Sequence, residues 1–188
     1  MLLCYLFGTS RNLAISKWKW EKTRENWLKS AEFGGESRLI ALLQRVTRAE
    51  VKVAGEVIAE IGRGLLVLVG VVRGDSALEA EKLAERGLRY RVFADADGRM
   101  NLSVREVKGA VLLVPQFTLA ADTNGGLRPS FSSAAPPGLG ASLFMHMAEQ
   151  VRASGLQSAC GRFGADMQVS LTNDGPVTFW LEARPRET

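Results

Sequence analysis

Two short segments combine residue types that could do chemistry. Residues 114–122 (VPQFTLAAD) end an apolar run and bring an amide, a hydroxyl and several backbone N–H groups to the expected end of a strand. Residues 173–180 (NDGPVTFW) bring a Gly-Pro peptide to the mouth of another strand. Backbone N–H groups that are fixed in place can stabilise an oxyanion, and the turn at Gln116, Phe117 and Thr118 could supply them. The alternative is a plain strand end, where the Thr118 hydroxyl bonds the backbone.

The usual catalytic and metal-binding groups are scarce. His146 is the only histidine, and the pattern places it on a helix beside an apolar stripe, where a surface or structural role is expected. A Ser-His-Asp or Cys-His relay would have to use it. Cys4 and Cys160 are the only cysteines, which argues against a zinc site and a disulfide framework and favours a reducing cytoplasm. No phosphate loop or dinucleotide fingerprint follows a strand. We therefore expect no cofactor and no catalytic metal.

Composition and charge are ordinary for a globular protein. The chain has 188 residues, of which 46% are hydrophobic and 23% charged, enough for one domain with a sizeable core. No apolar run approaches the roughly 18 residues that a membrane span needs. The apolar start lacks the basic residues that open a secretory signal, so we expect neither secretion nor a membrane partner. Residues 1–38 contribute +3 of the net charge of +4, so residues 39–188 are almost neutral. These residues could bind RNA only through a local basic patch.

Residues 1–38 differ from the rest of the chain. Trp18, Trp20 and Trp27 alternate there with lysines, which could suggest contact with nucleic acid or a membrane surface. The segment lacks sustained periodicity, however, and ends in a linker-like stretch at residues 33–37. We therefore expect residues 1–38 to be a disordered or dispensable extension, and residues 39–188 to form the functional domain.

The periodicity of residues 40–188 predicts an α/β domain in which strands outnumber two long helices. The first helix should begin at Ser76, which forms a capping box with Glu79. Residues 95–98 carry an acidic pair but lack the other ligands of a calcium loop, so a turn is expected. Predicted strands span residues 40–46, 50–54, 57–61, 65–72, 110–114, 167–171 and 177–181, the last two joined by a turn at 173–176; a second helix is centred on residues 143–151, after a long loop at 122–138.

Taken together, the two segments resemble the signature motifs Ser-Gln-x-Thr and Gly-Pro-Val-Thr of the D-aminoacyl-tRNA deacylases. The resemblance covers almost all of residues 39–188. It implies a compact three-layer α/β domain with a strand-rich, partly barrel-like sheet, and a cytoplasmic homodimer. The implied activity is hydrolysis of the ester that joins a D-amino acid, or mischarged glycine, to the 3′ end of tRNA. Proteins of this family begin at the position where Leu39 stands. The codon for Leu39 would then be a non-standard start codon that has been misread as leucine.

The resemblance also assigns roles to residues. It places Gln116 and the backbone of Phe117 and Thr118 along the scissile ester. It implies that the Gly175–Pro176 bond is cis and enters the active site of the partner subunit, where rigid main chain leaves no room for an L-side chain.

Three further positions match the family pattern. Arg45 would brace the Gly-Pro element, Phe163 would stack on the terminal adenine and Met167 would line the pocket. The alternatives are an edge-strand arginine and two core residues. Arg128 and Arg162 are candidates for phosphate contact.

One departure from the family pattern is Pro115, which stands where the family usually has serine. Proline removes a hydroxyl and a backbone donor. A serine nucleophile is therefore impossible at this position, whereas a site that uses backbone donors and the substrate's own 2′-hydroxyl tolerates the change.

Two other functions are compatible with these residues. One is a non-enzymatic nucleic-acid-binding relative of the same fold, which Pro115 and the Lys/Trp-rich extension favour. The other is an editing module that acts beside a synthetase, against which the lack of a synthetase domain argues.

Overall fold

The computed structural model describes residues 38–123 and 125–184. The expectation for residues 1–38 therefore lies outside the described residues, Arg38 apart. The strands are β1 (Leu39–Val53), β2 (Glu56–Ile61), β3 (Gly64–Gly70), β4 (Phe93–Ala94), β5 (Met100–Leu102), β6 (Ala110–Pro115), β7 (Ser158–Cys160) and β8 (Gln168–Ala183). The helices are α2 (Ala77–Arg89), the short 3₁₀ helix η2 (Phe117–Ala120) and α3 (Pro137–Ala153).

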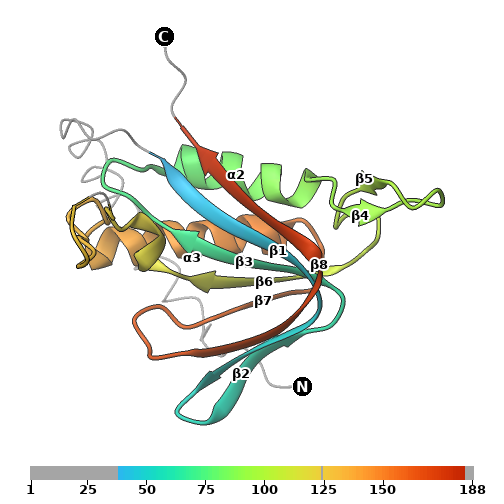
Figure 1. The fold of residues 1–188 in the computed structure, drawn as a ribbon, viewed down its shortest axis with the longest axis horizontal. Coiled ribbons are helices and arrows are strands. Elements are labelled where there is room, and N and C mark those ends of the chain that lie inside the picture. The colour runs from blue at the N-terminus through green and yellow to red at the C-terminus, as the bar shows by residue number, and fades with distance from the viewer. Residues whose placement is uncertain (1–37, 124, 185–188) are drawn as a thin grey trace, which may run out of the picture. The chain divides into compact units, whose positions relative to one another are not determined.

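A single bent strand organises the main sheet, whose order is β2-β1-β3-β6-β7 with β8 also paired to β1. The first half of β1 pairs with β3 and the second half with β2, both antiparallel, and β8 runs antiparallel along both halves. Strands β3, β6 and β7 are mutually parallel. Because β1 carries two different neighbours along its length, the sheet curls over itself and nearly closes (Figure 1). The predicted α/β fold with a partly barrel-like sheet is confirmed.

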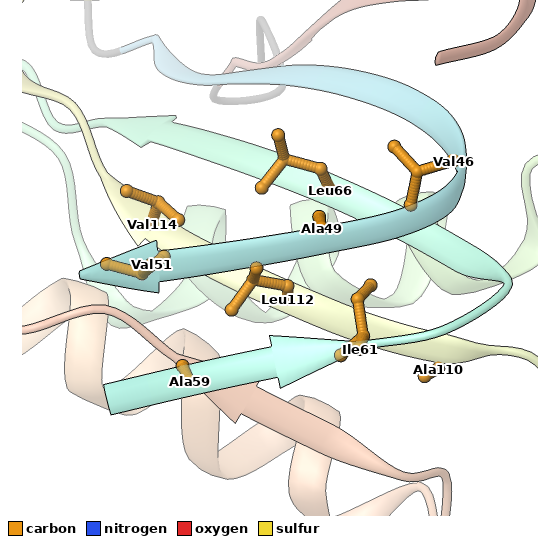
Figure 2. Packing of buried hydrophobic residues seen from close by; sticks show 9 residues of the cluster. All are labelled: Val46, Ala49, Val51, Ala59, Ile61, Leu66, Ala110, Leu112 and Val114. Atoms are coloured by element: carbon orange, nitrogen blue, oxygen red, sulfur yellow. The ribbon is translucent and has the colours of Figure 1, made fainter. Parts of the chain in front are cut away.

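The central strands β3 and β6 are buried on both faces, which explains their apolar sequences. Along β6, Val111 and Leu113 face the side covered by helices, where Leu83 of α2 and Met147 of α3 also lie. Their neighbours Leu112 and Val114 point into the curl of the sheet, as period-two geometry requires. Figure 2 shows that second core, which is formed by nine buried residues: Val46, Ala49, Val51, Ala59, Ile61, Leu66, Ala110, Leu112 and Val114.

Helices α2 and α3 pack against each other on the same face of the sheet (Figure 1). The predicted capping box at the start of α2 is confirmed: the Ser76 N–H donates to the Glu79 carboxylate at 3.1 Å, and the Ser76 hydroxyl accepts from the Leu78 N–H at 3.2 Å. The expected turn at residues 95–98 joins β4 to β5. Within residues 38–123 and 125–184, no helix has both the length and the apolarity to cross a membrane.

The prediction of separate strands at both ends of the domain was wrong. Residues 40–46 and 50–54 fall largely in the single strand β1, and residues 167–171 and 177–181 belong almost entirely to β8. Residues 173–176 do not reverse the chain. In the ladder between β1 and β8, Gln44 pairs with Thr178 and Val46 pairs with Asn173. The four residues 174–177 of β8 therefore lie opposite the single residue Arg45 of β1 and loop out as a bulge. Turn-forming residues thus interrupt the pairing without ending the strand.

Candidate active site

The cleft beside the end of β6 has a volume of about 490 Å³, enough for a nucleoside-sized ligand. Its walls come from the end of β6 and the start of η2, from the start of α3, and from the segment between β7 and β8. The lining residues are Val114, Pro115, Gln116, Phe117, Ala134, Ala135, Pro137, Phe163, Gly164, Ala165, Met167 and Val169. No side chain in this set is ionisable at neutral pH. The cleft wall therefore contains no side chain that could act as a general acid or a general base.

The turn that follows β6 lies beside the cleft, which Gln116 and Phe117 line. The N–H of Gln116 donates to the carbonyl of Val69 at 2.7 Å, which fixes the turn on β3. The Gln116 side-chain amide donates to the Thr118 hydroxyl at 2.6 Å. Within the described chain, no acceptor is assigned to the N–H of Phe117 or of Thr118. Both groups therefore remain available to a ligand.

Gly70 allows the turn to approach β3 this closely. A Cβ atom at residue 70 would lie 2.8 Å from the Cβ of Leu119 and 3.2 Å from the carbonyl oxygen of Gln116. Leu119 in turn packs against a small buried cluster that includes Ile40 and Ala120. The position of the turn thus depends on a residue without a side chain.

Phe163 and Met167 also line the cleft. The Phe163 ring lies over Gly140 of α3, where a Cβ atom would come within 3.2 Å of the ring. The Met167 sulfur lies against Gly161, 2.9 Å from the position that a Cβ atom would take there. The predicted Gln116, Phe117, Phe163 and Met167 thus line one cleft. Small residues at 140 and 161 let the larger side chains pack inward.

The bulge of β8 carries the Gly175–Pro176 peptide, which is cis as the resemblance implied. Arg45 holds its base: the Nε donates to the Asp174 carbonyl at 2.7 Å and lies 3.0 Å from the Asp174 carboxylate. The Arg45 Nη1 donates to the carbonyl of Val92, which anchors the guanidinium from the other side. Arg45 is therefore positioned to fix the direction of the bulge.

Asn173 ties the bulge closed, a role that the sequence analysis missed. Its amide nitrogen donates to the carbonyls of Arg45 and Val177, at 3.1 and 3.0 Å, and its amide oxygen accepts from the Val177 N–H at 3.3 Å. An asparagine two residues before a Gly-Pro is the signal that could have indicated this, because asparagine bonds nearby backbone readily.

The cleft and the bulge are separate within one chain. Arg45, Gly175 and Pro176 are not among the residues that line the cleft. Gly175 and Pro176 are exposed, although the bulge that carries them is tightly bonded. Arg128 and Arg162 are also exposed. The exposed Gly175–Pro176 peptide and the cleft are therefore two distinct features of the chain surface.

The pKa shifts in the structure lie away from the cleft. Four carboxyl groups have a pKa below the ordinary value, each chiefly because a neighbouring side chain bonds the ionised form, and none lines the cleft. They are Glu50 beside Lys52, Asp95 beside Asn101, Glu106 beside Ser103 and Glu182 beside Trp180. These interactions stabilise turns and strands and supply no catalytic group to the cleft.

His146 joins the two helices. Its Nε2 lies 2.9 Å from the Glu81 carboxylate, so the side chain bridges α3 and α2 on the helical side of the sheet. We predict that His146→Asn leaves kcat/KM for the reaction that the family resemblance implies within about threefold of wild type, or about 0.7 kcal/mol. Steady-state kinetics checks this, with thermal unfolding as the control for the lost interhelical bond. A loss of a thousandfold or more in a folded variant would instead make His146 the general base.

Comparison with known proteins connects this geometry to one family. The model of the family described as D-Tyr-tRNA(Tyr) deacylase matches residues 42–182. A D-aminoacyl-tRNA deacylase of Nitrosococcus oceani is 63% identical over 147 residues, which cover 78% of this chain and 95% of that relative. A D-aminoacyl-tRNA deacylase of Escherichia coli O81 is 58% identical over 144 residues, covering 77% and 99%.

Two solved structures share the architecture. The c-Myc DNA Unwinding Element Binding Protein superposes with a TM-score of 0.73 at 40% identity, over 78% of this chain and 99% of that one. A probable eukaryotic D-amino acid tRNA deacylase gives a TM-score of 0.69 at 17% identity, over 77% and 99%, and shows the likeness of fold. Because the family model spans most of the chain and curated relatives are more than half identical to it, the chain belongs to the D-Tyr-tRNA(Tyr) deacylase family of hydrolases.

Proposed function

We propose that this protein hydrolyses the ester between a D-amino acid and the 3′ end of tRNA, releasing the free amino acid and tRNA. The observation that carries the proposal is the turn with two N–H groups, at Phe117 and Thr118, that have no acceptor in the described chain, beside a nucleoside-sized cleft that Phe117 lines and that has no ionisable wall. An aminoacyl ester suits such a site because it is already activated. Its ribose also carries a neighbouring 2′-hydroxyl that can help to move a proton.

In this mechanism the protein positions the ester and stabilises the charge that develops on its carbonyl oxygen. The N–H groups of Phe117 and Thr118 donate to the oxyanion, and the Gln116 amide holds the Thr118 hydroxyl beside them. Removing one oxyanion donor from an enzyme costs about 10²–10³ in kcat. No metal and no cofactor is needed, and the attacking water replaces the tRNA ribose oxygen on the carbonyl carbon.

The cleft wall offers a binding site for the 3′-terminal nucleotide of the tRNA. Phe163 offers an aromatic face and Met167 an adaptable apolar contact, which together suit the adenine of the terminal nucleotide. Phe163 and Phe117 line the same cleft. An adenosine stacked on Phe163 would therefore direct its 3′ ester toward the N–H groups of Phe117 and Thr118.

Discrimination between D- and L-esters is assigned to the Gly175–Pro176 tip of the partner subunit in a homodimer. The tip is exposed, it is fixed by Arg45 and Asn173, and it does not line the cleft of its own chain. Main chain placed against the α-carbon would clash with an L-side chain, and each tenfold of discrimination needs only about 1.4 kcal/mol. Glycine has no side chain to exclude, so mischarged glycyl-tRNA is also a substrate.

The test is deacylation of matched D-tyrosyl-, glycyl- and L-tyrosyl-tRNA by the full chain and by residues 39–188, with a chelator present. The expected result is rapid loss of the D-tyrosyl and glycyl esters, a spared L-tyrosyl ester, and equal rates for the two forms. Hydrolysis of all three esters would contradict the role of the tip. Loss of activity on deleting residues 1–38 would contradict the division into a dispensable extension and a deacylase domain. The tRNA substrate is also the reason to place the protein in the cytoplasm.

Pro115 supplies a separate prediction. The residue continues the β6 ladder opposite Val69 and lines the cleft with its ring. Since the proposed chemistry uses the donors of residues 117 and 118, Pro115→Ser should change kcat by less than about threefold, or 0.7 kcal/mol. Single-turnover deacylation of D-tyrosyl-tRNA measures this directly. A gain of a hundredfold or more on restoring the hydroxyl would show that a serine at this position takes part in the chemistry.

A second candidate function is nucleic-acid binding without hydrolysis. It is favoured by the 40% identity to a solved structure whose name describes a protein that binds a DNA unwinding element. Tight binding of duplex DNA that is lost on deleting residues 1–38, with no hydrolysis of any aminoacyl-tRNA, would support it over deacylation.

A further inference from the structure

Two aromatic rings stand exposed at the rim of the cleft. Phe117 is 58% exposed and Phe131 is 41% exposed, although both are large hydrophobic residues. Their ring centroids are 5.1 Å apart and the ring planes are inclined by 57°. Phe117 lines the cleft, and Phe131 is not among the lining residues. The pair therefore extends an aromatic surface from the cleft outward.

The loop that carries Phe131 is bonded to the framework of the site on both sides. Before Phe131, Asp122 and Ser130 exchange backbone hydrogen bonds of 2.8 and 2.9 Å. After it, the Arg73 N–H donates to the Ser133 carbonyl at 2.9 Å, and the Ser133 hydroxyl donates to the carbonyl of Ala120 in η2. Phe131 is thus held beside η2 before any ligand arrives, which lowers the entropy cost of stacking on it.

Positive charge flanks the same loop. Arg128 lies three residues before Phe131 in the loop. Arg73 is next to the loop, because its backbone N–H donates to the carbonyl of Ser133. Both arginines are exposed, and within residues 38–123 and 125–184 neither takes part in an ion pair. Guanidinium groups in this state are available to a phosphate.

We propose that the Phe117–Phe131 pair is a stacking platform for the nucleobase that precedes the terminal adenosine of the tRNA, with Arg128 and Arg73 facing the phosphates beside it. The inference rests on the proposed function, which places the terminal adenosine in the cleft. The next base of the single strand must then leave the cleft at its rim. Single-stranded bases stack on exposed aromatic side chains, and alanine substitution at such contacts typically weakens binding about tenfold or more.

The first test compares the binding of adenosine and of the dinucleotide cytidylyl-adenosine to the full chain by NMR titration. The wild type should bind the dinucleotide about tenfold more tightly than adenosine, Phe131→Ala should lose this gain, and Phe131→Tyr should keep it. Leu127→Ala is the matched control, because Leu127 is a fully exposed apolar residue of the same loop. A dinucleotide with an abasic first position keeps the phosphate and should bind Phe131→Ala and wild type equally.

The second test compares hydrolysis of D-tyrosyl-tRNA with that of D-tyrosyl-adenosine, which ends before the proposed platform. Phe131→Ala should lose about tenfold more kcat/KM on the tRNA than on the nucleoside ester. Equal losses on both substrates, equal binding of adenosine and dinucleotide by the wild type, or a changed oligomeric state of Phe131→Ala would overturn the proposal. A wild type that hydrolyses neither ester would contradict the proposed function instead, and the binding titration would still decide the platform.

Discussion

Replacing Gly70 with alanine is expected to lower kcat for D-aminoacyl-tRNA by about 10²–10³ while the protein stays folded. The new Cβ atom would lie 2.8 Å from the Cβ of Leu119 and 3.2 Å from the Gln116 carbonyl oxygen, so the turn must move away from β3. The donors of Phe117 and Thr118 move with that turn. A displacement of about 1 Å at a catalytic group can cost a hundredfold in rate.

The effect of Gly70→Ala should appear in kcat rather than in folding. Overpacking of this kind costs about 1–3 kcal/mol of stability, which thermal unfolding will detect without loss of the native state. Gly87→Ala on α2 is the control, since a Cβ atom there meets nothing within 4 Å. A kcat within threefold of wild type, together with a clear fall in melting temperature, would show that the turn does not stabilise the oxyanion.

Replacing Gly175 with alanine is expected to reduce the ratio of kcat/KM for D- over L-tyrosyl-tRNA by about a hundredfold, which corresponds to about 2.7 kcal/mol. A Cβ atom at this position would collide with the Val177 nitrogen and with the Asn173 side-chain oxygen that holds the bulge closed. Neither neighbour can move without opening the hydrogen bonds that position the tip. The main chain that excludes an L-side chain is then misplaced.

This second variant should also remain folded, because the tip is exposed and the ladder on both sides of it is unaffected. Gly62→Ala is a suitable control, as a Cβ atom there meets nothing within 4 Å. Competitive deacylation of D- and L-tyrosyl-tRNA in one reaction gives the ratio directly. An unchanged ratio, with both rates reduced alike, would assign chiral discrimination to another part of the site.

Much of the fold follows from local sequence signals. The capping box at Ser76 defines the start of α2, and the apolar run at residues 65–72 identifies β3, which is buried along almost its whole length. The bulge of β8 could not be predicted in the same way. Asn, Asp, Gly and Pro at residues 173–176 suit a chain-reversing turn as well as a loop out of a continuous strand. Only the pairing of both halves of β8 with one long β1 decides between them.

Part of the candidate site was also predictable from the sequence. The motif at Gln116 to Thr118 was identified from its residue types, and Phe163 and Met167 from the family resemblance, and all but Thr118 are among the residues that line the cleft. Gly70 and Asn173 were missed because their importance lies in contacts with distant segments. Gly70 admits the turn that follows β6, and Asn173 bonds the backbone of Arg45. The contact of Gly70 depends on sheet pairing and leaves no local pattern, whereas the place of Asn173 two residues before Gly175 is a local signal.

The central proposal is that catalysis and chiral discrimination use two main-chain elements from different subunits. Mixing the two glycine variants tests it most directly. Gly70→Ala damages the cleft and leaves the tip intact, and Gly175→Ala does the reverse. In a symmetric dimer that shares its sites, each mixed dimer contains one site with an intact cleft and an intact tip. After subunit exchange, about half of the intact clefts in an equal mixture face an intact tip, so the rate of L-tyrosyl-tRNA hydrolysis should fall to about half of the average of the two separate variants, while the D-tyrosyl-tRNA rate stays at the average. An L-tyrosyl-tRNA rate that remains at the average after exchange would contradict the shared site.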